Sequence, residues 1–181
     1  MFISRIASLS SVPVQVVILL CVALLDTRAA AAEAEPRLAP DWTLDGTDGG
    51  VVNFHTNARG APAVLFFWAS WCPHCGAALP YMEALYQEFA PQGVHFYALD
   101  VWEDGDAVAY FRKHDYHLPL FLAADLVADD YGIDATPGVI VVDRALQIHD
   151  LDLDGAPPRT IAVVLRDYLR AEVKQPVVTA R

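Results

Sequence analysis

One stretch decides the fold of this chain: Trp68-Ala69-Ser70-Trp71-Cys72-Pro73-His74-Cys75-Gly76-Ala77-Ala78-Leu79-Pro80. The run that leads into it, Ala63–Trp68, is entirely apolar and predicts a buried strand. After the cysteines, apolar residues recur at helical spacing, at Leu79, Met82, Leu85, Tyr86 and Phe89. The pattern places Cys72 at the N-terminus of a helix, with Pro73 at the first helical position.

This position predicts a reactive thiol at Cys72. A helix N-terminus presents unpaired backbone N–H groups and the positive end of the helix dipole, which stabilise a thiolate over a thiol. We therefore expect Cys72 to be the nucleophile. Cys75 follows one helical turn later and is expected to resolve a mixed disulfide formed at Cys72. His74 brings ring N–H groups and the capacity for positive charge beside the same sulfur, which should depress the thiolate pKa further.

The N-terminus has the pattern of a secretory leader. A positive charge at Arg5 precedes the apolar stretch Val12–Leu25, and Ala29–Ala32 supplies small residues for cleavage. We expect a signal peptide over residues 1–32 and a periplasmic protein. An uncleaved signal anchor that leaves the domain facing the periplasm is the alternative, because the apolar segment extends back to Ile6.

Composition and cysteine count narrow the class of protein. The chain has 181 residues, enough for one domain with a proper core. Without residues 1–32, Lys and Arg fall from 12 to 10 and Asp and Glu from 23 to 22, so the net charge is −12. Such an acidic surface repels phosphate backbones, and we expect no nucleic-acid partner. A C-x-x-C loop is too tight to join distant segments, so the remaining cysteine pair favours catalysis over a structural disulfide.

Strands and helices alternate along the rest of the chain. Residues 33–41 are expected to be a flexible lead-in, residues 42–172 the domain and residues 173–181 a tail. The predicted strands are Trp42–Leu44 and Val51–Phe54 as a hairpin, Ala63–Trp68, Val94–Val101, Leu118–Leu122, and Gly138–Val142 with Leu146–Leu151 as a second hairpin. The predicted helices are one from Cys72 to about Ala90, then Asp104–His114, Asp125–Tyr131 and Pro158–Glu172. This order predicts an α/β fold with a mixed sheet.

A second motif, Thr136-Pro137, opens the predicted strand Gly138–Val142. A C-x-x-C helix upstream and an X-Pro at the head of the last hairpin together resemble the thioredoxin superfamily. The N-terminal hairpin and the helix and strand within Val101–Leu122 are similar to its exported branch, the TlpA/ResA-like reductases and DsbE-like cytochrome c maturation thioredoxins.

The resemblance implies a three-layer α/β/α sandwich with a mixed sheet, an N-terminal hairpin and a central helix–strand insertion. It implies thiol:disulfide exchange with cysteine-containing protein substrates, a membrane redox partner that recycles the dithiol, and neither a cofactor nor a metal. It also implies a cis Pro137, a Thr136 backbone that pairs with an extended substrate, and a Trp71 side chain that flanks the exposed sulfur.

The chain departs from the family at three places. Phe66 stands where thioredoxins carry a buried acid, and Ala78 stands where ResA-like proteins carry a glutamate. Asp100 and Glu103, at the end of the next strand, are candidate proton acceptors for the resolving thiol, with a solvated role as the alternative. The dipeptide Pro73-His74 matches that of DsbA-type oxidases and is expected to tune the couple, lowering the Cys72 pKa and making the disulfide more oxidising than that of thioredoxin.

Two other functions stay open on the sequence. A thiol peroxidase of the same superfamily needs Thr-x-x-Cys and a nearby arginine, whereas Ala69 stands three residues before Cys72. A non-catalytic binding module would not need both cysteines.

A zinc site at the dithiol would need two further ligands, and His114 with His117 lacks a third partner. The acidic residues around the predicted helix Asp125–Tyr131 and at the end of the last hairpin are expected to be solvated. They are Asp125, Asp129, Asp130, Asp134, Asp150, Asp152 and Asp154.

Overall fold

A six-stranded mixed sheet organises the described part of the chain, which comprises residues 37–149, 151, 153 and 155–174 of a computed structural model. The strand order is β1-β8-β7-β4-β5-β6, in which β4, β5 and β6 run parallel and β7, β8 and β1 pair antiparallel. A separate hairpin is formed by β2 and β3. The strands are β1 Arg37–Leu38, β2 Thr43–Asp45, β3 Val51–Asn53, β4 Ala63–Trp68, β5 His95–Asp100, β6 Leu120–Phe121, β7 Gly138–Val142 and β8 Gln147–His149.

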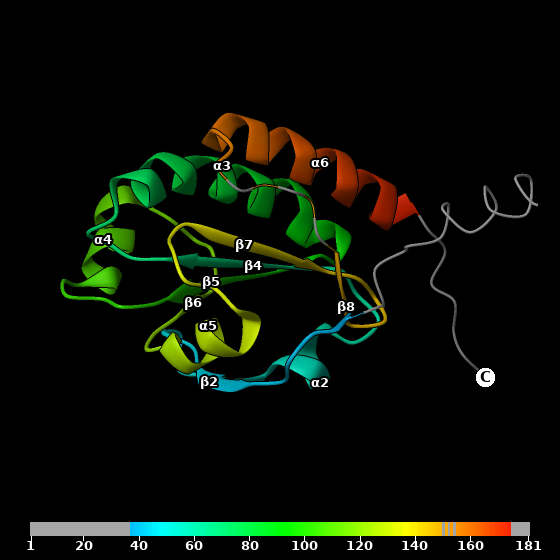
Figure 1. Cartoon of the computed structure of the whole chain (residues 1–181), viewed down its shortest axis with the longest axis horizontal. Helices are drawn as coiled ribbons and strands as arrows, with labels where there is room; N and C mark the ends of the chain where they lie inside the picture. Colours follow the sequence, from blue (N-terminus) through cyan, green and yellow to red (C-terminus); the bar gives the residue numbers. More distant parts are fainter. Residues whose placement is uncertain (1–36, 150, 152, 154, 175–181) are drawn as a thin grey trace, which may run out of the picture. The chain divides into compact units, whose positions relative to one another are not determined.

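Helices cover both faces of the sheet, so the predicted three-layer α/β/α arrangement is confirmed (Figure 1). On one face lie α3 and α6, and on the other lies α5. The helices are α2 Phe54–Ala58, α3 Pro73–Phe89, α4 Ala107–His114, α5 Asp125–Tyr131 and α6 Pro158–Lys174, and a short 3-10 turn covers Ala90–Gln92.

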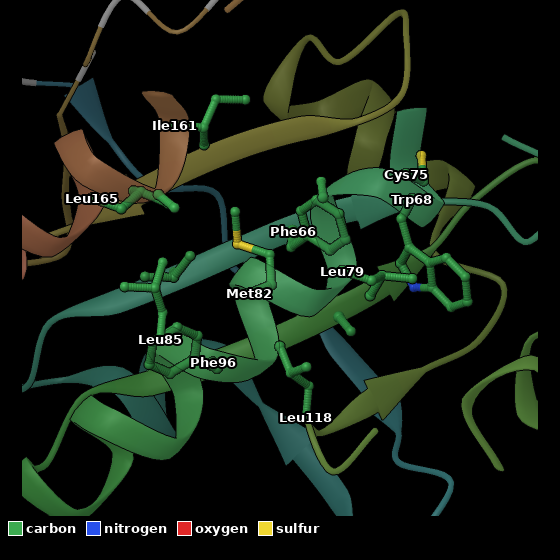
Figure 2. Close-up of a cluster of buried hydrophobic side chains, with 14 of the residues drawn as sticks. Phe66, Trp68, Cys75, Leu79, Met82, Leu85, Phe96, Leu118, Ile161 and Leu165 are labelled. Carbon is green, nitrogen blue, oxygen red and sulfur yellow. The ribbon is translucent and has the colours of Figure 1, made fainter. Parts of the chain in front are cut away.

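Strand β4 is buried along its whole length and separates two apolar cores. Its side chains alternate between the faces, as those of any strand do. Phe66 and Trp68 pack in the core formed with α3 and α6. Leu65 and Phe67 pack in the core formed with α5 and the β2–β3 hairpin. Figure 2 shows Phe66 within the first of these cores, together with Met82 of α3. The core beneath the C-x-x-C helix is therefore apolar.

Helix α3 follows the predicted pattern closely. Cys72 is its N-cap and Pro73 occupies the first turn, where the missing N–H costs nothing. The side chains of Leu79, Met82, Leu85 and Phe89 are buried, which confirms the predicted helical periodicity. Pro80 lies inside the helix with its ring exposed.

The structure differs from the sequence prediction near the start of the domain. Residues 37 and 38 form β1 on β8, and Ala39 is buried, so this part of the expected flexible lead-in belongs to the sheet and core. The Tyr131 hydroxyl donates to the Pro40 carbonyl and holds the segment down. Helix α2 was not predicted, and it forms because the Asn53 side chain accepts a hydrogen bond from the Thr56 N–H.

The predicted leader over residues 1–32 lies outside the described residues, as does the tail from residue 175. Among the described residues, none of the helices combines the length and apolar character that a bilayer-spanning segment needs. The export prediction therefore stays a prediction.

Candidate active site

The two cysteines lie within the first turn of α3, and both are free thiols in this structure. The Cys75 backbone N–H donates to Cys72 Sγ at 3.3 Å, so the sulfur itself caps the helix. Cys72 is 5% exposed and Cys75 is fully buried. Figure 2 shows Cys75 beside the apolar core that contains Trp68. Of the two cysteines, only Cys72 keeps any exposure, which is the order expected if Cys72 is the nucleophile.

The two thiols differ in acidity. Burial acts to raise the pKa of Cys72. Hydrogen bonds with the side chains of Cys75 and Thr136 and with the N–H groups of Cys75 and His74 lower this pKa by more than burial raises it. The resulting pKa of Cys72 lies below the ordinary value for a thiol. Burial raises the pKa of Cys75 to about 12, and its hydrogen bond with Cys72 acts in the same direction. The pair thus contains one thiol that ionises readily and one that keeps its proton.

The Thr136–Pro137 peptide bond is cis, which confirms the expectation drawn from the resemblance. The Cys72 thiol lies 3.5 Å from the Thr136 carbonyl oxygen and donates to it. These residues meet because β7, which begins directly after Pro137, pairs with β4, which ends just before the cysteines. The pairing of β4 with β7 thus brings together two residues that lie 64 positions apart in the sequence.

Trp71 lies at the surface next to Cys72 and is 49% exposed. Its indole N–H donates to the Trp102 carbonyl oxygen at 2.7 Å, and Trp102 is itself 37% exposed. The Trp102 N–H in turn donates to Asp125 Oδ1 at 2.8 Å. Asp125 is thus more than a solvated acid, and the sequence offered no signal for either Trp102 or this contact.

The two candidate acids lie close to each other and to the turn before Cys72. Glu103 accepts hydrogen bonds from the N–H and the hydroxyl of Ser70, at 2.8 and 2.7 Å. Asp100 is 4% exposed, and its Oδ1 atom has no hydrogen-bond partner among the residues that the structure describes. Burial raises the pKa of Asp100 to about 8, with further contributions from its hydrogen bond to Glu103 and from the charges of Glu103 and Asp125. Among the hydrogen bonds of the described residues, none joins either acid to a cysteine.

No acid takes the two positions where the family carries one. Phe66 is 1% exposed and Ala78 is fully buried, and both belong to the apolar core that also contains the cysteines. Pro73 and His74 are exposed on the first turn of α3. The structure assigns the His74 backbone N–H to Cys72, while tuning by the His74 ring stays a prediction.

Other candidate groups lie away from the dithiol. Among the described residues, no cluster of three or more His, Cys, Asp or Glu side chains is suited to a metal ion. His114 stacks on Tyr110 at a ring distance of 4.5 Å, and His117 lies 3.4 Å from Glu83. A cavity of about 690 Å³ opens at the β5–β6 edge of the sheet, lined by residues such as His95, Phe111 and Leu118, and neither cysteine borders it.

Comparisons with known proteins agree with this geometry. Thiol-disulfide oxidoreductase ResA of Bacillus subtilis is 32% identical over 106 residues, which cover 58% of this chain and 59% of that protein. The thioredoxin-like protein YneN of Bacillus subtilis is 28% identical over 121 residues, or 65% of this chain and 70% of that one. The match to ResA thus leaves two fifths of that protein's length without a counterpart.

Solved structures share the fold at low sequence identity. A thiol:disulfide interchange protein of Chlorobium tepidum superposes with a TM-score of 0.64 at 19% identity, covering 76% of this chain and 99% of that one. StoA of Bacillus subtilis gives a TM-score of 0.58 at 17% identity, covering 72% and 99%. These likenesses confirm the predicted thioredoxin-like fold. A family model described as the AhpC/TSA family matches residues 37–150, and the chain therefore belongs to that family, with its dithiol at the start of α3.

Proposed function

We propose that this protein is an exported thiol:disulfide oxidoreductase that exchanges disulfides with cysteine-containing protein substrates. The observation that supports it is the unequal pair: Cys72 keeps slight exposure and has a lowered pKa, whereas Cys75 has no exposure and has a raised pKa. Thiolate attack needs the first kind of group, and resolution from within the protein needs the second. The names of the ResA relatives agree with this activity.

The exchange follows from the positions of the two sulfurs. The Cys72 thiolate attacks a substrate disulfide, forms a mixed disulfide and releases one substrate thiolate. Cys75 then loses its proton and attacks Cys72 Sγ, which forms the Cys72–Cys75 disulfide and releases the second substrate thiolate. Two electrons pass from the protein to the substrate, and the reverse sequence oxidises a substrate dithiol.

The substrate approaches beside Thr136 and Trp71 in this proposal. The Thr136 carbonyl lies next to Cys72 Sγ, where an extended substrate chain could pair with it through main-chain hydrogen bonds. The exposed Trp71 ring, next to Cys72 in the sequence, offers an apolar contact. Reading the backbone in this way suits many protein substrates, including the apocytochromes of cytochrome c maturation.

The direction of exchange is proposed from the charge around Cys72. Groups that stabilise the thiolate stabilise the reduced protein and make its disulfide more oxidising. Hydrogen bonds lower the Cys72 pKa, and the floor of the site offers Phe66 and Ala78 instead of an acid. We therefore expect a couple more oxidising than thioredoxin's value of about −270 mV, recycled by a membrane redox partner.

The test is the equilibrium potential of the Cys72–Cys75 pair against glutathione, combined with trapping on a Cys75→Ser variant. We expect a potential above that of thioredoxin and a trapped protein held by a disulfide to Cys72. Cys72→Ser should trap nothing and should lower exchange by about a thousandfold or more. Full exchange activity in Cys72→Ser would contradict the proposal, and a thioredoxin-like potential with trapped apocytochromes would reverse the direction.

Peroxidase activity is the alternative that the same samples can test. Ala69 occupies the place of the threonine that such a site needs. We expect hydrogen peroxide to be consumed no faster by the wild type than by a small dithiol at the same concentration. Rapid peroxide turnover that depends on Cys72 would replace the proposal with that alternative.

A further inference from the structure

The turn Ala69–Trp71 carries Cys72 and is held by a carboxylate from another loop. Glu103 Oε2 accepts the Ser70 N–H at 2.8 Å, and Glu103 Oε1 accepts both the Ser70 hydroxyl and the Gly105 N–H at 2.7 Å. One side chain therefore fixes a backbone N–H and a hydroxyl that lie 33 positions earlier in the chain. Burial acts to raise the pKa of Glu103. The hydrogen bonds from these donors and from Asp100 lower this pKa by more than burial raises it, so Glu103 is a carboxylate.

A side chain at residue 105 would push against the two side chains that make this contact. A Cβ atom on Gly105 would lie 2.7 Å from Ser70 Oγ and 3.1 Å from Glu103 Oε1. Real Cβ atoms essentially never come as close as 2.7 Å, so a side chain here would have to displace the Ser70 hydroxyl from its position. Gly105 therefore lets the loop backbone lie against the turn without disturbing the contact between Ser70 and Glu103.

Asp100 completes the contact from the end of β5. It pairs in register with Trp68 of β4, two positions before Ser70, and it shares a hydrogen bond with Glu103. The charged groups that act on it are Glu103, from the loop after β5, and Asp125, from α5, and both are acids. Asp100 is 4% exposed, and among the described residues no donor hydrogen bonds to its Oδ1, so the protein around the carboxyl group does little to stabilise a negative charge. Asp100 therefore keeps its proton at neutral pH and donates it to Glu103.

The held turn acts directly on the site. The Cys72 N–H donates to the Ala69 carbonyl at 3.2 Å, and the Ala69 backbone also hydrogen bonds with Cys75. The same loop accepts the Trp71 indole N–H through the Trp102 carbonyl. Moving Ser70 would therefore move the sulfur and the ring at its side.

We propose that Asp100 and Glu103 form a carboxyl pair that positions the Ala69–Trp71 turn, and that ionisation of Asp100 releases the turn and changes the reactivity of Cys72. The proposal rests on the proposed function, because Cys72 is the group whose reactivity it concerns. Both acids are positioning residues in this role. Direct proton transfer between either acid and Cys75 is a separate prediction.

The test follows Cys72 and Ser70 against pH in the reduced full-length chain. Between pH 6 and 9.5, the rate of Cys72 alkylation by iodoacetamide should first rise with the Cys72 thiolate and then change again, at least threefold, near pH 8. The hydrogen-exchange protection factor of the Ser70 amide should fall at least fivefold over the same second step. Neither measurement uses a protein substrate, so a failed exchange assay would not affect the result.

Three variants separate positioning from general structural damage. Asp100→Asn keeps an N–H donor to Glu103 but cannot ionise, so it should keep wild-type values at pH 6.5 and lose the second step. Glu103→Gln should show the low Ser70 protection already at pH 6.5. Asp104→Asn removes an exposed acid one position beyond Glu103 and should behave as the wild type.

The same second step in wild type and Asp100→Asn would overturn the proposal, as would full Ser70 protection in Glu103→Gln. If Glu103→Gln fails to fold, Ser70→Ala provides the same test, because it removes one of the two hydrogen bonds between Ser70 and Glu103 at a half-buried position. It should lower the protection of the residue 70 amide at least twofold, and unchanged protection would also overturn the proposal.

Discussion

At the start of α3, a thiolate on Cys72 is stabilised by hydrogen bonds from N–H groups of its own helix, above a floor of apolar side chains. At the end of β5, one strand away, two interacting carboxyl groups have pKa values shifted in opposite directions, raised for Asp100 and lowered for Glu103. Thioredoxin-like proteins commonly place an acid beneath the dithiol, and here the acids lie beside the turn that carries it. The comparison teaches that acids supplied by a neighbouring strand and loop contact the turn that carries the dithiol, while the core beneath the dithiol stays apolar.

The largest effect should come from opening the apolar floor. Phe66 is 1% exposed in the core beneath α3, so Phe66→Ala should lower the free energy of unfolding by about 3–5 kcal/mol. Urea unfolding followed by far-UV circular dichroism measures this loss. Phe66→Leu is the matched control and should cost less than about 1.5 kcal/mol. A loss below that control value in Phe66→Ala would show that the floor is not packed as described.

The contribution of Asp100, at the end of β5, to the free energy of unfolding should change with pH in the direction opposite to that of an ordinary surface carboxylate. The pKa of Asp100 is raised to about 8 in the folded chain from 3.8, so folding takes up a proton between these values. Wild-type stability should therefore fall as pH rises from about 4 to 8, since the unfolded state binds fewer protons.

Removing that charge should stabilise the protein only at the high end of this window. Asp100→Asn should match the wild type near pH 4 and exceed its free energy of unfolding by about 2 kcal/mol at pH 8. Thermal unfolding at the two pH values checks the difference, with Asp104→Asn as the exposed control. Equal gains at both pH values would mean that Asp100 is not protonated in the folded state.

The smallest effect concerns the close approach between the start of α3 and helix α4. A Cβ on Gly76, in the first turns of α3, would lie 2.8 Å from the Tyr110 hydroxyl of α4. Gly76→Ala should gain little stability in the wild type, but about 1 kcal/mol in a Tyr110→Phe background, where helix propensity acts without the clash. A double-mutant cycle with no coupling between these residues would show that Tyr110 moves aside freely.

The sequence by itself determined the elements that depend on local pattern. The apolar run of β4, the N-cap at Cys72 and the spacing of Leu79, Met82 and Leu85 each follow from residues within a few positions of one another. Helix α5 ends at Gly132 as predicted, because the chain there takes a left-handed conformation that glycine adopts readily. The resemblance to thioredoxins then supplied the cis Pro137, which the structure contains.

Only the tertiary structure decided which distant groups meet. Ser70 and Glu103 are separated by 33 positions, and their contact depends on a loop in which Trp102 adopts a φ of 50°. No periodicity encodes such a loop, because its shape is set by contacts such as Trp102 with Asp125 rather than by local propensity. The strand-end position of Asp100 and Glu103 indicated that they were candidates, but burial decided their protonation, and burial is a property of the whole fold.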